Sequence, residues 1–386
     1  MKQIKFILAL AAITLTAYFQ NAVASVITLA LITPGDFTFT PKEVRDFADV
    51  IIETAFENPD INEFHTIVED IVTDENIGYL GRLSKQTKAD AGCGTGKRTV
   101  NIPGYEKTWT PKKTKIWIEE CLDTLDQTFM VYLKKKGVDN NDWTNTDIAD
   151  FLMGLVETAV AEDIQRIAWF SDEDAANADD SPAGVITAGV STEDYTIIPA
   201  GFFKQLYAIV LADSNRRVVI ARNAQATYAL QEFDSTDTTN RVASGIIRDV
   251  IQKADPRLRA QKNKVLLMTE SVAFQYQAEL EAAGVEASFK MIQTGVSVLE
   301  RLGVTIIAYN FWDRTIRADF DNGTSWYQPH RVVMTTKEQL MIGIDAKSSI
   351  GKWDIYYDKD SEKSNLKGGF KIDAKIKEDH MVQVAY

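Results

Sequence analysis

The stretch Lys264-Val265-Leu266-Leu267-Met268-Thr269-Glu270 decides the fold class of this chain. Four consecutive apolar residues between polar ends are typical of a strand that is buried on both faces. A helix is predicted to follow from Glu270 or Ser271 to Ala283, where Gly284 ends it. A buried strand that leads directly into a helix indicates an α/β unit, in which helices cover a sheet.

The neighbouring residues continue this alternation. Helices and short strands are predicted over residues 201–212, 218–221, 237–254 and 304–309. Asn322-Gly323 is a strong hairpin signal, so residues 315–320 and 324–327 are expected to pair around it. The order predicts an α/β unit with a small mixed sheet. Five further strands are predicted near the C-terminus, over residues 331–334, 339–344, 353–357, 369–376 and 381–386.

The N-terminal half has a different organisation. Thr40-Pro41-Lys42-Glu43 is a capping box that predicts a helix to about residue 58, and a second helix is expected from Asp60 to about Asp70. Residues 78–111 are rich in glycine and lack apolar periodicity, which predicts an extended excursion. A strand over residues 115–120 and a long amphipathic helix over residues 147–170 are expected to follow.

The excursion is strongly basic in an acidic protein. The chain has 386 residues and a formal net charge of −13, which disfavours sequence-specific binding of nucleic acid. The stretch from Arg82 to Lys115 contains nine basic residues, which are predicted to contact neighbouring subunits: Arg82, Lys85, Lys88, Lys97, Arg98, Lys107, Lys112, Lys113 and Lys115. Only Asp90 and Glu106 oppose them. Two interpretations remain open, a solvated basic loop or an arm that lies on an acidic neighbouring subunit.

Patterns that would indicate an enzyme are incomplete in this sequence. Residues 91–98 approach a phosphate-binding loop, but Ala91 replaces the first glycine and Arg98 replaces the serine or threonine. Residues 358–363 begin like a calcium loop, but Lys363 stands where glycine is required. The three histidines have no companions at ligand spacing: His65, His330 and His380. We predict no catalytic, cofactor-binding or metal-binding residues and no small-molecule substrate.

The N-terminus resembles a secretory signal. Lys2 and Lys5 precede an almost wholly apolar stretch, and Ala22-Val23-Ala24 forms an A-x-A cleavage site before Ser25. The two cysteines, Cys93 and Cys121, do not make a disulfide framework that would require export. A cleaved signal, a maturation segment and an upstream extension of the true start therefore stay open for residues 1–24.

Several phrases, in their order along the chain, resemble the major capsid proteins of tailed phages. They are Val265 to Glu270 leading into a helix, Leu302 to Ile307 leading to Trp312, Pro329 to Thr336 with Leu340 to Asp345, and the terminal Val382-Gln383-Val384-Ala385-Tyr386. The resemblance covers roughly residues 35–386. It implies an α+β chain with the Hong Kong 97-type capsid fold, which encapsulin shells share, with an extended N-terminal arm, a long loop, a spine helix and a compact α/β axial domain.

The resemblance also implies a domain order and a function. The expected segments are a signal-like segment (1–34), a helical arm (35–74), the basic loop (75–115), a peripheral domain with the spine helix (116–200), an axial domain (201–324) and C-terminal strands that complete the peripheral domain (325–386). The implied function is self-assembly into pentamers and hexamers of an icosahedral shell in the virion, assembled in the host cytoplasm. The implied partners are further copies, non-specifically bound double-stranded DNA, and portal, scaffold and decoration proteins. The alternative is an exported, non-enzymatic binding protein of a bacterial envelope, in the periplasm or secreted.

Overall fold

The computed structural model describes residues 64–80, 104–121, 159–160, 162–175, 186–234, 238–285, 289–293, 296–301, 303–344, 354–358 and 363–386. All of them belong to the larger of two compact units, which consists of Thr54–Leu122 and Val138–Tyr386. Within these ranges, no helix combines the length and the apolar character that crossing a membrane requires. Predictions that fall wholly within residues 1–63, 81–103 and 122–158 lie outside the described residues. The helix predicted from Asp60 to about Asp70 is wrong where it is described, because Thr66–Val68 forms a strand that pairs with Met341–Gly343.

A seven-stranded mixed sheet contains the buried stretch Lys264–Met268. In spatial order its strands are β6 (Arg217–Val218), β16 (Gln383–Ala385), β11 (Val332–Thr336), β7 (Lys264–Met268), β10 (Val304–Tyr309), β9 (Val296–Arg301) and β8 (Lys290–Gln293). The central strand β7 pairs parallel to β10 and antiparallel to β11. The strand predicted at residues 264–268 is therefore confirmed, and it lies at the centre of the sheet.

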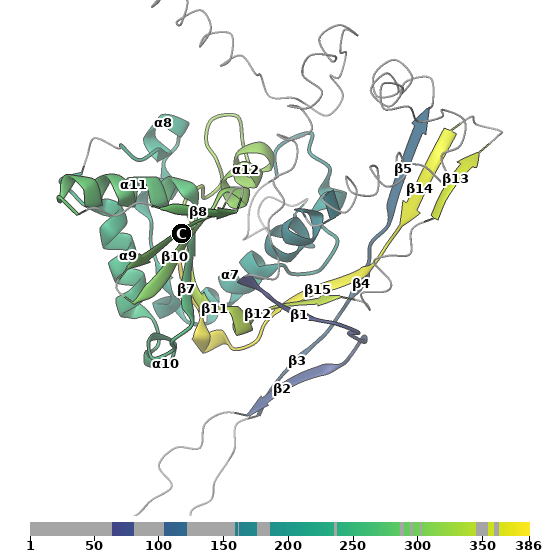
Figure 1. The fold of residues 1–386 in the computed structure, drawn as a ribbon, viewed down its shortest axis with the longest axis horizontal. Helices are drawn as coiled ribbons and strands as arrows, with labels where there is room; N and C mark the ends of the chain where they lie inside the picture. Colours follow the sequence, from purple (N-terminus) through teal and green to yellow (C-terminus); the bar gives the residue numbers. More distant parts are fainter. Residues whose placement is uncertain are drawn as a thin grey trace, which may run out of the picture. The chain divides into compact units, whose positions relative to one another are not determined.

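Both faces of this sheet are buried, each by its own hydrophobic cluster. Successive side chains of a strand point to opposite sides, so neighbouring residues belong to different clusters. In β7, Leu266 and Met268 belong to one hydrophobic cluster, whereas Leu267 belongs to the other. The first cluster is covered by α9 (Val242–Lys253), α10 (Pro256–Arg259) and α11 (Glu270–Ala282). The second is covered by α7 (Phe202–Ala212), α12 (Asn310–Asp319) and the helical residues 162–170. Figure 1 shows α9 and α7 on opposite sides of the sheet.

A second, four-stranded sheet packs against α7, whose Gln205 hydrogen-bonds the backbone of Ala374 and Ile376. Its order is β1 (Thr66–Val68), β12 (Leu340–Ile344), β15 (Lys371–Ile376) and β4 (Lys112–Lys113). Gly343 in β12 allows a close approach, because a Cβ at this position would lie 2.7 Å from Ile71 Cδ1 and 2.9 Å from Trp109. Ile71 and Trp109 thereby cover the outer side of the sheet in a small cluster with Met341.

Two smaller sheets extend from this region. One is three-stranded, in the order β13 (Asp354–Asp358), β14 (Lys363–Gly368) and β5 (Ile116–Cys121), and the other is the hairpin of β2 (Asn76–Leu80) and β3 (Gly104–Thr108). Gly369 joins β14 to β15 where a Cβ would lie 2.5 Å from the carbonyl oxygen of Thr114. The remaining helices in the described part of the chain are short: η1 (Thr192–Asp194), η2 (Ser214–Arg216), η3 (Ala221–Ala224), α8 (Tyr228–Gln231), η4 (Lys337–Gln339) and η5 (Asp379–Met381).

The hairpin predicted around Asn322-Gly323 is wrong in its strands. Gly323 does form a turn with φ of 86°, and Asp321 and Trp326 make an isolated bridge across it. The preceding residues form α12, because Phe311, Trp312, Thr315 and Ile316 place a buried face at helical spacing. A local turn signal fixes the turn but does not fix the conformation of the segments that enter and leave it.

The C-terminal strands divide between the sheets. β11 and β16 join the seven-stranded sheet, whereas β12, β15, β14 and β13 join the four- and three-stranded sheets. The resemblance placed this whole return in the peripheral sheet, and the strand pairing therefore differs from that expectation. Pairing partners of this kind lie far apart in the sequence, so periodicity alone does not identify them.

Candidate functional site

The N-terminus of α11 is capped by the side chain of another helix. Its N-cap residue Thr269 makes no side-chain cap, and Asp313 of α12 takes this role. The backbone N–H of Glu270 donates to Asp313 at 2.6 Å, and that of Ser271 donates at 3.4 Å. Burial raises the pKa of Asp313 to about 7, and the charge of Glu270 adds to the shift, while these backbone donors oppose it.

A second cap of the same kind links α11 to α9. The α9 N-cap residue Arg241 adopts a left-handed conformation and makes no side-chain cap. The buried carboxylate of Glu279 in α11 instead accepts the N–H groups of Ala243 at 2.8 Å and Ser244 at 2.7 Å. A negative charge at a helix N-terminus also interacts favourably with the helix dipole. The two caps connect α12 to α11 and α11 to α9.

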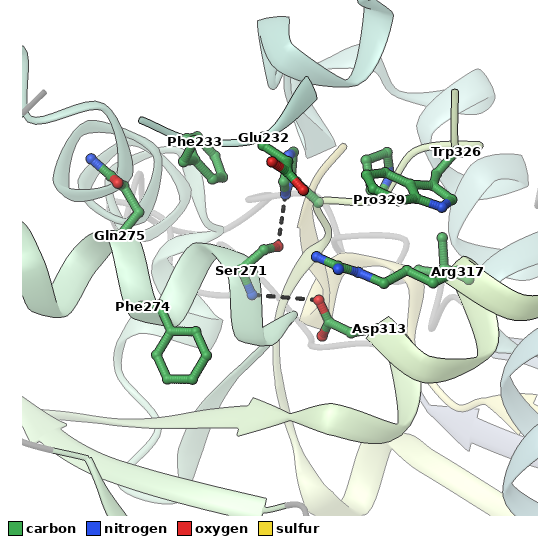
Figure 2. Close-up of a pocket in the computed structure, with 11 residues that line it drawn as sticks. Glu232, Phe233, Ser271, Phe274, Gln275, Asp313, Arg317, Trp326 and Pro329 are labelled. Carbon is green, nitrogen blue, oxygen red and sulfur yellow. Dashed lines mark hydrogen bonds between the residues drawn. The ribbon is translucent and has the colours of Figure 1, made fainter. Parts of the chain in front are cut away.

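Above the first cap lies a pocket of about 210 Å³, which we call the Asp313 pocket. Its lining residues come from the two residues after α8, from α11 and α12, and from the segment before β11: Glu232, Phe233, Ser271, Phe274, Gln275, Asp313, Ile316, Arg317, Trp326, Pro329 and His330. Figure 2 shows the Ser271 backbone directed at Asp313 and the Arg317 side chain crossing between Asp313 and Trp326. The pocket therefore has an apolar rim and a polar floor.

His330 forms the floor together with Ser271. Its Nε2 lies 2.8 Å from the carbonyl oxygen of Gln231, which only accepts, so Nε2 carries a proton. Its Nδ1 lies 2.7 Å from Ser271 Oγ. Burial lowers the pKa of His330 to about 4, so near neutral pH the ring is uncharged and Nδ1 accepts the serine hydroxyl proton in a hydrogen bond.

This serine–histidine pair has the contact of a nucleophile and its base, but its surroundings oppose acyl transfer. The helix N–H groups nearest Ser271 would be the natural donors to an oxyanion. They already donate to the carboxyl group of Asp313, so they are not available to an oxyanion. The geometry favours a structural role for the pair.

Two side-chain amides, Gln231 of α8 and Asn223 of η3, hold the segment before β11 against these two helices. Gln231 is buried, and it donates to the carbonyl of Trp326 at 2.8 Å and accepts its N–H at 2.9 Å. Asn223 makes the same paired contact with the backbone of His330, at 2.7 and 3.0 Å. The Arg317 guanidinium lies 4.9 Å from the centre of the Trp326 ring. Sequence reasoning missed these residues, because amides that bind backbone at long range leave no local pattern.

The predicted basic contact residues are only partly within the described structure. Arg82, Lys85, Lys88, Lys97 and Arg98 lie outside it. The Nζ atom of Lys107 lies 2.6 Å from the carbonyl oxygen of Ile376 and 2.5 Å from Asp379 Oδ1. Lys107 therefore forms its salt bridge with a residue of the same chain. Lys112, Lys113 and Lys115 are exposed on β4 and just before β5.

The structure adds an exposed aromatic side chain to these lysines. Trp117 of β5 is 49% exposed, and the Nζ atoms of Lys115 and Lys367 each lie 4.2 Å from its ring centre. Lys367 comes from β14 and lies directly opposite Trp117 in the strand register. We define the lysine platform as Lys112, Lys113, Lys115, Lys367 and Lys371 together with Trp117. Lys367 and Trp117 are 250 residues apart in the sequence, so no local pattern predicts that they lie side by side.

The histidines are separate from one another in the fold. Buried His65 accepts a hydrogen bond from Trp169 Nε1 at 3.0 Å and stacks on Phe202, and His380 lies 3.1 Å from Glu378. Among the residues that the structure describes, no three His, Cys, Asp or Glu side chains are arranged to hold a metal ion.

Comparison with known proteins identifies the fold. No family model and no curated protein matches the chain. A chain in the procapsid of satellite phage P4, in a structure that includes the size determination protein, is similar at a TM-score of 0.50 and 9% identity, over 88% of this chain and 97% of that chain. The capsid of cyanophage P-SCSP1u aligns with a TM-score of 0.47, 12% identity and 93% of both chains. An encapsulin of Synechococcus elongatus aligns with a TM-score of 0.43, 9% identity and 94% of both chains. On the likeness to the P4 procapsid chain, and in agreement with the sequence resemblance, this protein has the Hong Kong 97-type capsid fold.

Proposed function

We propose that this chain is a major capsid protein that assembles into pentamers and hexamers of an icosahedral shell enclosing phage DNA. The observation that carries the proposal is the likeness to the P4 procapsid chain, which extends over 97% of that chain. Because the likeness covers nearly the whole of a shell subunit, it supports a shell subunit more than a binding domain that shares one sheet.

The exposed apolar side chains support several small interfaces. Among the described residues the large ones lie on different elements: Val72, Trp117, Leu211, Val219, Leu230 and Phe274. A stable pair of subunits usually buries one large, contiguous apolar surface. Dispersed contacts suit a closed shell, in which many weak interfaces act together.

The charge of the chain suits a container for DNA. With a net charge of −13, the protein as a whole does not attract a phosphate backbone, so packaged DNA would be held only non-specifically. The basic loop, including Arg82, Lys85, Lys88, Lys97 and Arg98, is proposed to contact an acidic neighbouring subunit. Portal, scaffold and decoration proteins would be the further partners of such a shell.

The test is the assembly state of the purified full chain. Size-exclusion chromatography and electron microscopy at several salt concentrations are expected to show pentamers, hexamers or shells. Stable monomers under all these conditions would overturn the proposal.

A further inference from the structure

The Asp313 pocket contains a cation that forms no ion pair. Arg317 lies on α12, and its guanidinium is 4.9 Å from the centre of the Trp326 ring. Among the residues that the structure describes, no carboxylate makes an ion pair with Arg317 and no acceptor takes a hydrogen bond from it, so its N–H donors are available to a ligand. Figure 2 shows this side chain extending from α12 into the pocket. A guanidinium in this position suits a carboxylate, which it can bind through two hydrogen bonds.

Asp313 supplies a second donor to the same pocket. Its Oδ2 accepts the N–H of Glu270 at 2.6 Å, whereas Oδ1 has only a long contact of 3.4 Å with the N–H of Ser271. Because burial raises the pKa of this carboxyl to about 7, its neutral form is well populated at and below neutral pH. The proton then belongs on Oδ1, since Oδ2 is the acceptor of the closer N–H. A neutral carboxyl and a guanidinium therefore line one pocket.

Four other charged or titratable groups surround these two side chains. Glu270 at the start of α11 raises the pKa of Asp313 through its charge. His330 before β11 is neutral, because burial lowers its pKa to about 4. Arg222 of η3 donates to the backbone carbonyl of Glu232 at 2.7 Å, and the Glu232 side chain lines the pocket. Glu232 is the lining group that would oppose the binding of an anion.

The walls of the pocket suit a planar apolar group. They consist of three aromatic residues, an isoleucine and a proline: Phe233, Phe274, Trp326, Ile316 and Pro329. Aromatic side chains pack favourably on a ligand ring in offset or edge-to-face arrangements. At about 210 Å³ the pocket exceeds the volume of about 150 Å³ at which a protein cavity binds benzene, so it has room for a ring with a short acidic substituent. Phe274 is 61% exposed and offers an apolar surface that such a ring would cover.

We propose that the Asp313 pocket binds an aromatic carboxylate, with the acid group between Arg317 and Asp313 and the ring against Phe274. This inference goes beyond the proposed function, because it does not depend on whether copies of the chain assemble. An apolar ligand without a charge would use the walls but would leave Arg317 without a partner. A cationic ligand is disfavoured, because Arg317 would repel it.

Three probes that share one ring test the choice of acid group. Phenylacetate, phenylacetamide and 2-phenylethylamine carry a negative, a neutral and a positive group, and their binding to the purified full chain is measured by ligand-observed NMR titration at pH 6. Phenylacetate is expected to bind about tenfold more tightly than phenylacetamide, and the amine should bind most weakly. Equal affinities, a preference for the amine, or no saturable binding of phenylacetate would each overturn the proposal.

Substitutions separate the contribution of the charge from that of the ring. Arg317→Gln should weaken the binding of phenylacetate about tenfold and leave that of phenylacetamide nearly unchanged. Phe274→Ala should weaken both probes alike. The matched control is Arg314→Gln, which removes an exposed cation from the same helix but outside the pocket, and it should change neither affinity. Circular dichroism checks that the variants fold, and full affinity of folded Arg317→Gln for phenylacetate would contradict the proposal.

A variant with the opposite sign gives an independent test. Glu232→Gln removes the carboxylate that opposes an anion, so it should bind phenylacetate more tightly than the unmodified chain does. Weaker binding, with phenylacetamide unaffected, would count against the placement of the acid group.

The pH dependence of binding tests the role of Asp313. With a pKa of about 7, its protonated fraction falls about tenfold between pH 6 and pH 8, and the affinity for phenylacetate should fall by up to about the same factor. Asp313→Asn places an N–H donor where the proton was and cannot ionise, so its affinity should be nearly independent of pH. An equal pH dependence in this variant would refute the contact with Asp313.

A fourth probe distinguishes two sources of the ligand. N-acetylphenylalanine has the ring and the carboxylate of a peptide that ends in an aromatic residue. Tighter binding than that of phenylacetate would assign the pocket to a peptide C-terminus, and weaker binding would assign it to a free aromatic acid. Both results would support an aromatic carboxylate as the ligand.

Discussion

Asp313→Asn should remove a large pH dependence from the stability of the subunit. Folding buries Asp313 and raises the pKa of its carboxyl from 3.8 to about 7. The folded chain therefore holds this proton more tightly than the unfolded chain. The resulting stabilisation is fully present below about pH 4 and is lost as the pH rises to about 7.

The magnitude follows from the pKa values. Each unit of pKa difference corresponds to about 1.36 kcal/mol, so the free energy of unfolding of the unmodified subunit should fall by about 2.6 kcal/mol between pH 5 and pH 8 through this group alone. His330, whose pKa is lowered to about 4 in the folded subunit, contributes in the opposite direction over this range, because its ring binds a proton more readily in the unfolded chain. A comparison with Asp313→Asn removes that contribution, since both proteins carry His330. Asparagine cannot ionise, and its carbonyl oxygen can still accept the N–H of Glu270.

The assay is urea unfolding of unassembled subunits at pH 5 and pH 8, for the unmodified chain and for Asp313→Asn. The difference in unfolding free energy between the two proteins isolates this carboxyl from other titrating groups. That difference should change by about 2 to 3 kcal/mol between the two pH values. An exposed side chain that does not ionise provides the control: Leu211→Ala should give the same difference at both pH values. A pH-independent difference for Asp313→Asn would refute the assignment of a buried, protonated cap.

Three further results are expected. Glu279→Ala should lower the unfolding free energy by about 2 to 4 kcal/mol, because it leaves two N–H groups of α9 without their acceptor, whereas exposed Glu281→Ala should change it by less than about 0.5 kcal/mol. Trp312→Ala should cost about 3 to 5 kcal/mol through the cavity that it leaves, and Phe274→Ala, at a side chain that is 61% exposed, should cost far less, both measured by urea unfolding. Mass spectrometry of fractionated protein should find the chain in shells, and a periplasmic form that starts after Ala24 would support the export alternative.

Much of the local structure could be predicted from the sequence. The buried strand at 264–268 and the helix that follows it were predictable because an uninterrupted apolar run and a terminal glycine are local signals. The strand at residues 304–309 was predictable for the same reason. The exposed lysines before β5 were recognisable as a charged surface from composition alone.

The candidate sites depended on the tertiary structure. Glu279 and Asp313 read as ordinary acidic residues within helices, and only the packing of α11 on α9 and of α12 on α11 makes them caps. The lysine platform likewise requires the pairing of β5 with β14.

The sequence was enough to predict several of the buried strands and helices, because periodicity and end signals act over a few residues. It also determined the surplus of negative charge and the basic segment that opposes it. Three features became clear from the folded chain: the order of strands in each sheet, the helix in place of a hairpin at residues 310–319, and the partners of the buried polar groups. These features depend on contacts between residues far apart in the chain, whose free energy is shared among many side chains and leaves no signal at any one position.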